Sequence, residues 1–163
     1  MLIHETWAYR CDEPDFAPNG NSEEKMYKAL SHAYRSVASE LGLRILPVGD
    51  AFYAADTDPI WGYKPCAFDS SHAVYPNLPD QTNSLHVGWY WVKDPQGKYE
   101  LNTDCHHASP CGCYLAGCVW FEVLFGKSVV DNKFVPSDIT HQDAVFLRKI
   151  AHRAVQQLDE HGR

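Results

Sequence analysis

A carboxylate and an imidazole stand three residues apart, at Asp104 and His107, in the stretch 102–110. A serine-type hydrolase needs an imidazole to take the proton of its nucleophile, and a carboxylate on the other ring nitrogen to fix the tautomer. A single turn can deliver both groups together, so this pair is the strongest candidate for chemistry. His106 is the second candidate for the base. The non-catalytic interpretation is that Asp104 caps the turn and His107 donates to the backbone.

Two other chemistries compete for the same stretch. The first is zinc binding, because Cys and His side chains are zinc ligands and the stretch contains Cys105, His106, His107 and Cys111. However, no Cys-x-x-Cys pair occurs, and the spacing of Cys111 and Cys113 is shorter than structural zinc sites use. The other alternative is a thiolate nucleophile at Cys105, favoured by a neighbouring imidazolium. We rank both below the acid–base hypothesis and predict no metal and no cofactor.

A nucleophile for the Asp104–His107 pair is not evident. The chain has no Gly-x-Ser-x-Gly elbow. Ser70 and Ser71 lie in a predicted loop that lacks this context. We therefore expect that the 163 residues alone do not hydrolyse nitrophenyl acetate.

The element that follows the pair is a predicted helix over 110–125. Ser109 can cap its N-terminus, Pro110 suits the first helical position and Gly126 suits the end. The segment is apolar almost all round, which is typical of a buried helix.

The elements that precede the pair alternate between strand and helix. We predict a strand at the first residues, a polar loop over 11–21, a helix over 22–41, a strand over 44–48 and a helical turn after it. This order is typical of a parallel α/β sheet. The helical spacing predicts a core face for the first helix, formed by Met26, Leu30, Ala33, Tyr34, Val37, Ala38 and Leu41.

The middle of the chain is predicted to form a long irregular loop followed by a β-hairpin. Residues 55–84 contain four prolines and indicate irregular structure, whereas 85–92 and 98–101 indicate a β-hairpin. The aromatic residues of this region either stack on sugar rings or pack against one another; they are Trp61, Trp89, Tyr90 and Trp91. A final helix over 140–160 begins with Thr140 and Asp143 as a capping box.

Composition excludes several classes of partner. The net charge of −7 argues against nucleic acid and anionic membranes as partners. No apolar run is long enough to span a membrane, and the N-terminus lacks the regions of a signal peptide. The sequence assigns no localisation. The six cysteines are expected to be mostly free, buried thiols.

The stretch 104–126 resembles the last conserved block of the SGNH (GDSL-type) hydrolases, an Asp-x-x-His followed by a small residue, Ser, a Gly and a buried helix. The segments Thr6-Trp7-Ala8-Tyr9 and 45–52 are similar to one largely uncharacterised branch. The resemblance implies a three-layer, flavodoxin-like α/β fold. It also implies serine-type ester hydrolysis, with His107 as general base, Asp104 as its orienting partner, and a small-molecule or carbohydrate ester as substrate.

The chain departs from the family at the other conserved blocks. The Gly-Asp-Ser nucleophile block and the Gly and Asn blocks that bind the oxyanion are absent, and in the family these precede the Trp-Ala-Tyr stretch. We therefore expect residues 1–163 to form a single domain, the C-terminal part of an SGNH hydrolase-like domain, incomplete at its N-terminus. The alternative is a catalytically inactive fragment or ligand-binding domain. A truncated sheet would expose a strand edge, which predicts self-association.

Overall fold

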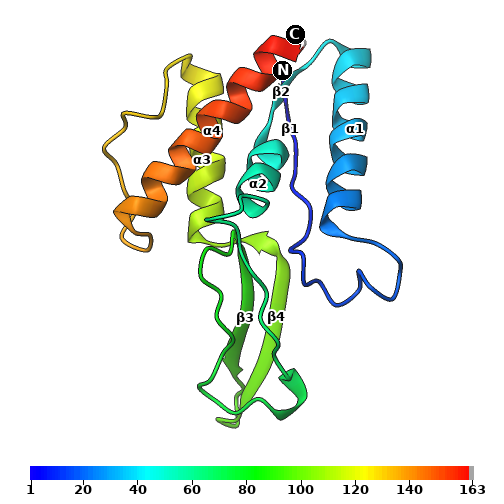
Figure 1. Ribbon diagram of the computed structural model, residues 1–163, viewed down its shortest axis with the longest axis vertical. Coiled ribbons are helices and arrows are strands. Elements are labelled where there is room, and N and C mark those ends of the chain that lie inside the picture. Colours follow the sequence, from blue (N-terminus) through cyan, green and yellow to red (C-terminus); the bar gives the residue numbers. More distant parts are fainter. Residues whose placement is uncertain (162–163) are drawn as a thin grey trace.

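The computed structural model describes residues 1–161, and the side chains of residues 1–158. The elements, in chain order, are β1 (Leu2–His4), α1 (Glu23–Leu41), β2 (Arg44–Leu46), α2 (Val48–Asp56), the 3₁₀ turn η1 (Ser70–His72), β3 (His86–Lys93), β4 (Tyr99–Ala108), α3 (Pro110–Phe125) and α4 (His141–His161) (Figure 1).

Two small sheets form within this chain. β1 pairs with β2 in parallel, with α1 as the connection between them. β3 pairs with β4 in the predicted antiparallel hairpin. The expectation of an α/β fold is thus confirmed in the form of a mixed α/β structure with a small parallel sheet and a small antiparallel sheet.

The main core lies where α2, α3 and α4 pack against β2. Its fully buried members come from all four elements and include Leu46, Phe52, Leu115, Val119, Leu147 and Ile150. α2 is longer than the single turn predicted from the sequence and follows β2 directly. Gly49, in the first turn of α2, lies against the backbone that follows β1. A Cβ added at this position would come within 2.4 Å of the Thr6 carbonyl oxygen.

The helix ends follow the sequence closely. Ser22 accepts from the backbone of Lys25, and Ser109 accepts from that of Gly112. Gly42 and Gly126 end α1 and α3 in the left-handed conformation that favours glycine. Each of these caps uses a partner within a few residues, which is why sequence patterns predict them.

Burial of the helices differs from the expectation. In α1, Ala38 is buried, whereas Val37 and Leu41 are exposed and Ala33 faces solvent. In α3, Leu124 and Phe125 are exposed, so the expectation of a helix covered on all sides is wrong. The parallel sheet has two strands, too few to cover helices on every side.

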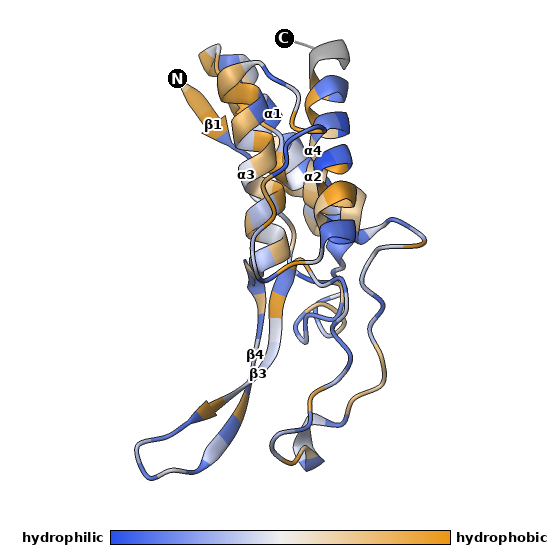
Figure 2. Ribbon diagram, turned by 90° about the vertical axis from the view of Figure 1, so that its left-hand side faces the viewer, coloured by the Kyte–Doolittle hydropathy of each residue, from blue (hydrophilic) through white to orange (hydrophobic). Residues whose placement is uncertain are grey.

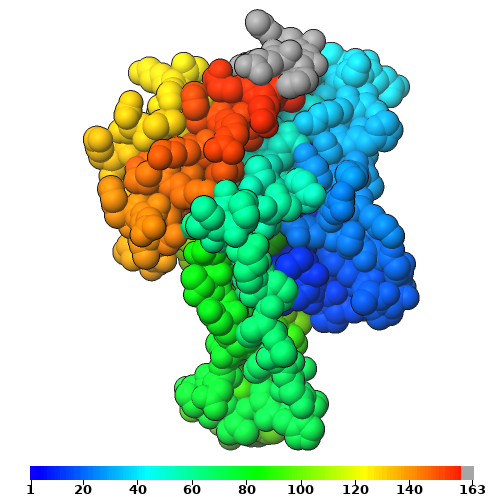
Figure 3. Space-filling model, viewed as in Figure 1, coloured from blue at the N-terminus to red at the C-terminus, as the bar shows by residue number. Residues whose placement is uncertain are grey.

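The hairpin projects from the helical body. Segment 64–80 packs along it through ring contacts, of which Tyr75 with Tyr99 is the closest, at 3.6 Å between centroids. Together, β3, β4 and segment 64–80 form a narrow lobe below the body, here called the arm (Figure 3). In residues 1–161, every helix falls short of the length or apolar character needed to cross a membrane.

Candidate functional site

The Asp104–His107 pair lies at the base of the arm, in a bulge of β4. A step of two residues in β3, from His86 to Gly88, is matched by a step of four in β4, from Ala108 to Asp104. Residues 105–107 therefore protrude from the ladder. The prediction of a turn is corrected, because these residues belong to β4, and the bulge gives them their local turn-like shape.

Asp104 closes this bulge through both carboxylate oxygens. Oδ1 accepts hydrogen bonds from the backbone nitrogens of His106 at 3.0 Å and His107 at 2.9 Å. Oδ2 lies 2.8 Å from Nδ1 of His107. The Asp104 side chain is 24% exposed, whereas that of His107 is 81% exposed. One carboxylate thus sets both the backbone of the bulge and the ring that it presents.

The protonation of Asp104 suits this role. Partial burial raises its pKa, but the hydrogen bonds from the two backbone amides and from His107, with the charge of that ring, outweigh burial and lower the pKa overall. The carboxyl is therefore ionised at neutral pH. When Nδ1 of a neutral His107 donates to this carboxylate, Nε2 carries the lone pair that a base requires.

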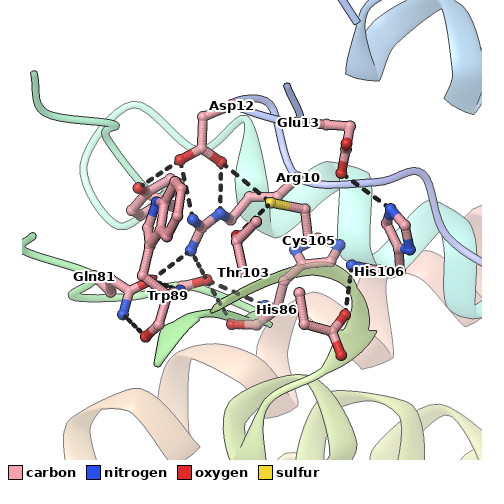
Figure 4. Close-up of polar contacts among 12 residues, drawn as sticks. Arg10, Asp12, Glu13, Gln81, His86, Trp89, Thr103, Cys105 and His106 are labelled. Carbon is pink, nitrogen blue, oxygen red and sulfur yellow. Dashed lines mark hydrogen bonds and ion pairs between the residues drawn. The ribbon is translucent and has the colours of Figure 1, made fainter. Parts of the chain in front are cut away.

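His106 is held in a different way and is the weaker candidate for the base (Figure 4). Its Nε2 lies 3.0 Å from Oε2 of Glu13, and its ring stacks on Tyr9 at 3.8 Å. The indole nitrogen of Trp7 donates to its carbonyl oxygen at 2.8 Å. Because its outer nitrogen is engaged, the geometry favours His107 as the free imidazole.

The pair lies near the carboxyl ends of β1 and β2. Trp7, three residues after β1, reaches the bulge and also stacks on Phe52 of α2 at 4.4 Å. α2 itself follows the end of β2. Open α/β sheets bind ligands beyond the carboxyl ends of their parallel strands, so the pair lies where this architecture places a site.

A second Asp-x-x-His shows what the spacing alone produces. In η1, Nδ1 of His72 lies 2.7 Å from Oδ2 of Asp69, with the two side chains 84% and 66% exposed. Oγ of Ser71 approaches the same Nδ1 at 3.0 Å. A catalytic triad needs the hydroxyl and the carboxylate on opposite ring nitrogens. The geometry at Asp69 therefore does not form a triad, and the Asp104–His107 pair differs from it in its partly buried carboxylate.

A buried polar cluster lies beside the bulge, and the sequence pattern did not predict it (Figure 4). Arg10 is 1% exposed and binds Asp12 through two hydrogen bonds, of 2.6 and 3.0 Å. It also donates to Gln81 and Ser84 and lies 4.5 Å from the centroid of the Tyr63 ring. These five residues, the Arg10 cluster, connect the loop after β1 to the residues on either side of segment 64–80. A single arginine in a polar loop gives no sequence signal of burial.

The carboxylates after β1 and β2 are also structural. Glu5 is fully buried, and Arg35 donates to it at 2.9 Å and to Asp50 at 2.5 Å. Glu5 is therefore a buried structural carboxylate. Asp12 is likewise structural, because it pairs with buried Arg10.

The competing chemistries of the 105–113 stretch do not fit the geometry. The Cys105 thiol is buried and lies 3.5 Å from Oγ1 of Thr103, and burial raises its pKa, which disfavours a thiolate nucleophile. Within the described part of the chain, no three His, Cys, Asp or Glu side chains are grouped to hold a metal ion. All six cysteines are free, but Cys11, Cys66 and Cys113 are exposed, so the expectation of mostly buried thiols is only half right.

The aromatic residues of the middle region are used in packing. Trp61 stacks on Phe146 at 4.7 Å, and its indole nitrogen donates to Asp143. Trp89 and Trp91 face the aromatic rings of segment 64–80. The packing interpretation accounts for these three tryptophans.

Comparisons with known proteins identify a similar fold but no family. No protein-family model matches the chain. No curated protein matches it either. Among solved structures, it is similar to the crystal structure of a DUF4886 family protein from Bacteroides uniformis, with a TM-score of 0.65 and 23% sequence identity. The match covers 95% of this chain and 47% of that protein, so this chain spans about half the length of the neighbour. At this identity the likeness shows the α/β fold alone.

Proposed function

We propose that this chain provides the acid–base half of a serine-type ester hydrolase, of the kind that its resemblance to the SGNH family implies. The observation that carries the proposal is the geometry of Asp104, which fixes the bulge through two backbone amides and holds Nδ1 of His107 at 2.8 Å. The exposed side of the His107 ring then presents Nε2 at the carboxyl edge of the parallel sheet.

In the proposed reaction, Nε2 of His107 accepts the proton of a serine hydroxyl as its oxygen attacks the ester carbonyl. The imidazolium keeps its Nδ1 hydrogen bond to Asp104, and it then returns the proton to the departing alkoxide. A water molecule, deprotonated by the same nitrogen, releases the acid and restores the serine. Backbone or side-chain N–H groups stabilise the oxyanion.

The serine and the oxyanion donors are proposed to come from a further polypeptide segment that completes the α/β domain. Among the described side chains, the ring of His107 hydrogen-bonds to Asp104, and no hydroxyl makes a hydrogen bond with its Nε2. Ser109 is engaged elsewhere, since its hydroxyl donates to the Ser84 carbonyl at 2.8 Å and caps α3. The solved neighbour is about twice as long as this chain, so about half of its polypeptide lies outside the matched part.

The proposal is tested with the chain produced together with the polypeptide encoded directly upstream, using nitrophenyl acetate as substrate. His107→Ala and Asp104→Asn are each expected to lower kcat by roughly 10⁴-fold, since the first removes the base and the second its tautomer control. His72→Ala is the matched control, because His72 has the same spacing and the same contact with its aspartate. It is expected to leave kcat unchanged.

Three results would contradict the proposal. One is activity of the 163-residue chain by itself that survives His107→Ala. The second is a combined preparation in which His107→Ala keeps full activity. The third is a lack of activity in every combination, which favours the alternative of a catalytically inactive ligand-binding domain.

A further inference from the structure

A long hollow runs beside α3. It lies between this helix and the loop 126–140, has a volume of about 690 Å³, and is here called the groove. One wall follows α3 from Pro110 to Phe121, and the other includes Val129, Phe134 and Pro136. Figure 1 shows the loop standing to the side of α3 on its way to α4. The volume is within the range of small-molecule sites, about 300–1,000 Å³.

Buried polar groups hold the outer wall of the groove in place. Arg148, which is buried, donates to the Val130 carbonyl at 3.2 Å and to the Tyr114 hydroxyl at 2.9 Å. That hydroxyl donates in turn to the Phe134 carbonyl at 2.8 Å. Buried Glu122 accepts from the backbone of Val129 at 2.9 Å. The loop is thus fixed at Val129, Val130 and Phe134 by specific hydrogen bonds, and the space behind it is part of the fold.

The side of the groove formed by α3 contains a glycine that packing does not explain. Gly117 is in the interior of α3, where glycine is less stable than alanine. A Cβ added there would meet no atom within 4 Å. No close approach therefore requires this glycine, and its effect is to widen the groove.

The groove has the shape and lining of a site for a linear alkyl chain. It extends from Pro110 to Phe121, about 16 Å along α3 at the helical rise of about 1.5 Å per residue. Its side chains are mostly apolar, and Asp138 is the charged residue in its lining. Its lining begins with Ala108, the residue after His107, and Pro110, the first residue of α3.

We propose that the groove binds the aliphatic acyl chain of the ester substrate, with the ester group near His107. This inference rests on the proposed function, and it assigns a medium-length, unbranched acyl group to the acid side of the ester. Each buried CH₂ is worth roughly a fourfold gain in affinity, so affinity is expected to rise with chain length until the groove is full.

The inference is tested by binding, without any hydrolysis. Octanoate and dodecanoate, below their micelle concentrations, are titrated into ¹⁵N-labelled chain while amide chemical shifts are followed. Dodecanoate is expected to bind at least about tenfold more tightly than octanoate. It is also expected to shift the amides of Tyr114, Gly117 and Phe134, which line the groove.

Gly117→Leu is the blocking variant, because its side chain enters open space and the helix keeps its hydrogen bonds. It is expected to weaken dodecanoate binding at least about tenfold. Ala33→Leu adds the same side chain to an exposed site on α1 and is expected to bind as the unmodified chain does. Thermal melts followed by circular dichroism show that both variants are folded.

The inference is overturned if affinity does not depend on chain length, if the shifts map to the arm, or if Gly117→Leu binds normally. It is also overturned if Gly117→Leu changes the association state of the chain, since the groove would then be an interface between copies. Binding in the groove without ester hydrolysis by the combined preparation would support the groove and refute the proposed function. Hydrolysis of acetate and dodecanoate esters at equal kcat/KM, unaffected by Gly117→Leu, would support the proposed function and refute the groove as the site of the acyl chain.

Discussion

Asp104 differs from Asp69 in its surroundings more than in its distance from a histidine. Both carboxylates reach Nδ1 of the histidine three residues later, within 2.8 Å. Asp69 does so on an exposed 3₁₀ turn, whereas Asp104 is partly buried where β4 meets α3. The spacing therefore predicts the contact, and the site depends on the rigid elements on either side of it.

A second feature at the scale of residues is the surplus of acid around Arg10. Its guanidinium makes two hydrogen bonds to Asp12, while Glu23 and Asp56 lie close enough to feel the same charges. Burial, together with the charge of Asp12, raises the pKa of Glu23 to about 7. Burial also raises the pKa of Asp56 well above its usual range.

We predict that Glu23→Gln stabilises the protein at pH 8. The folded chain holds the Glu23 proton more tightly than the unfolded chain, whose pKa is about 4.3. The contribution of Glu23 to stability is therefore greatest below the unfolded pKa, about 4.3, and is lost as pH rises through the folded pKa of about 7. Glutamine does not ionise, so the variant does not lose stability as the pH rises. Its melting temperature should exceed that of the unmodified chain at pH 8 and match it at pH 4.

Glu24→Gln is the control in the same helical turn. Glu24 is paired with Lys28 at 2.6 Å and its pKa is lowered by that bond, so its loss is expected to lower the melting temperature slightly at pH 8. Equal effects of the two variants on the pH profile would contradict the assignment to Glu23.

At the scale of elements, α3 is the part on which both proposals depend. Its N-terminus packs against the start of β3, and a Cβ on Gly112 would lie 2.3 Å from the Leu85 carbonyl oxygen. The backbone nitrogen of Ser109 donates to the same oxygen at 2.8 Å. The sequence shows a glycine near the start of a helix, but its reason is a close contact with a segment more than 20 residues away.

Two glycine-to-alanine substitutions in α3 are predicted to have opposite effects. Gly112→Ala should destabilise the fold by about 1–3 kcal/mol, as overpacking against backbone does. Gly117→Ala should stabilise it by about 0.5–1 kcal/mol, because the added methyl group meets nothing and the helix propensity improves. Urea unfolding measures both. A Gly112→Ala variant as stable as the unmodified chain would show that the backbone at Leu85 shifts at little cost to accommodate the added methyl group.

At the scale of the whole molecule, an apolar region beside β1 is exposed to solvent. Within the described residues β1 is hydrogen-bonded to β2 alone, and nearby α3 exposes Trp120, Leu124 and Phe125. Trp120 donates to Nδ1 of His4 at 2.9 Å, which joins this face of α3 to β1. Figure 2 shows hydrophobic colour on β1 and on the adjacent part of α3. A bare strand edge beside apolar side chains favours association.

We predict that the chain self-associates and that Leu124→Lys reduces this. The lysine places a charge within the exposed apolar region and should shift sedimentation velocity profiles toward the monomer. Ile60→Lys is the control, since Ile60 is 93% exposed in a loop elsewhere. A monomeric unmodified chain at high concentration would show that the exposed region is too weak to associate.

The sequence by itself determined those features whose partners lie within a few residues. The caps of α1 and α3, their glycine ends, the hairpin and the contact of Asp104 with His107 are of this kind. Their hydrogen bonds and backbone angles depend on local spacing, which a sequence pattern records directly.

Only the tertiary structure decided the features that join distant segments. Arg10 meets Gln81 across 71 positions, and Tyr114 meets the Arg148 that fixes the groove across 34. Burial of charge is tolerated when the folded chain supplies partners, and no local pattern shows which partners will be near. The base of the proposed hydrolase was therefore visible in the sequence, whereas the bulge that holds it and the groove along α3 emerged from the fold.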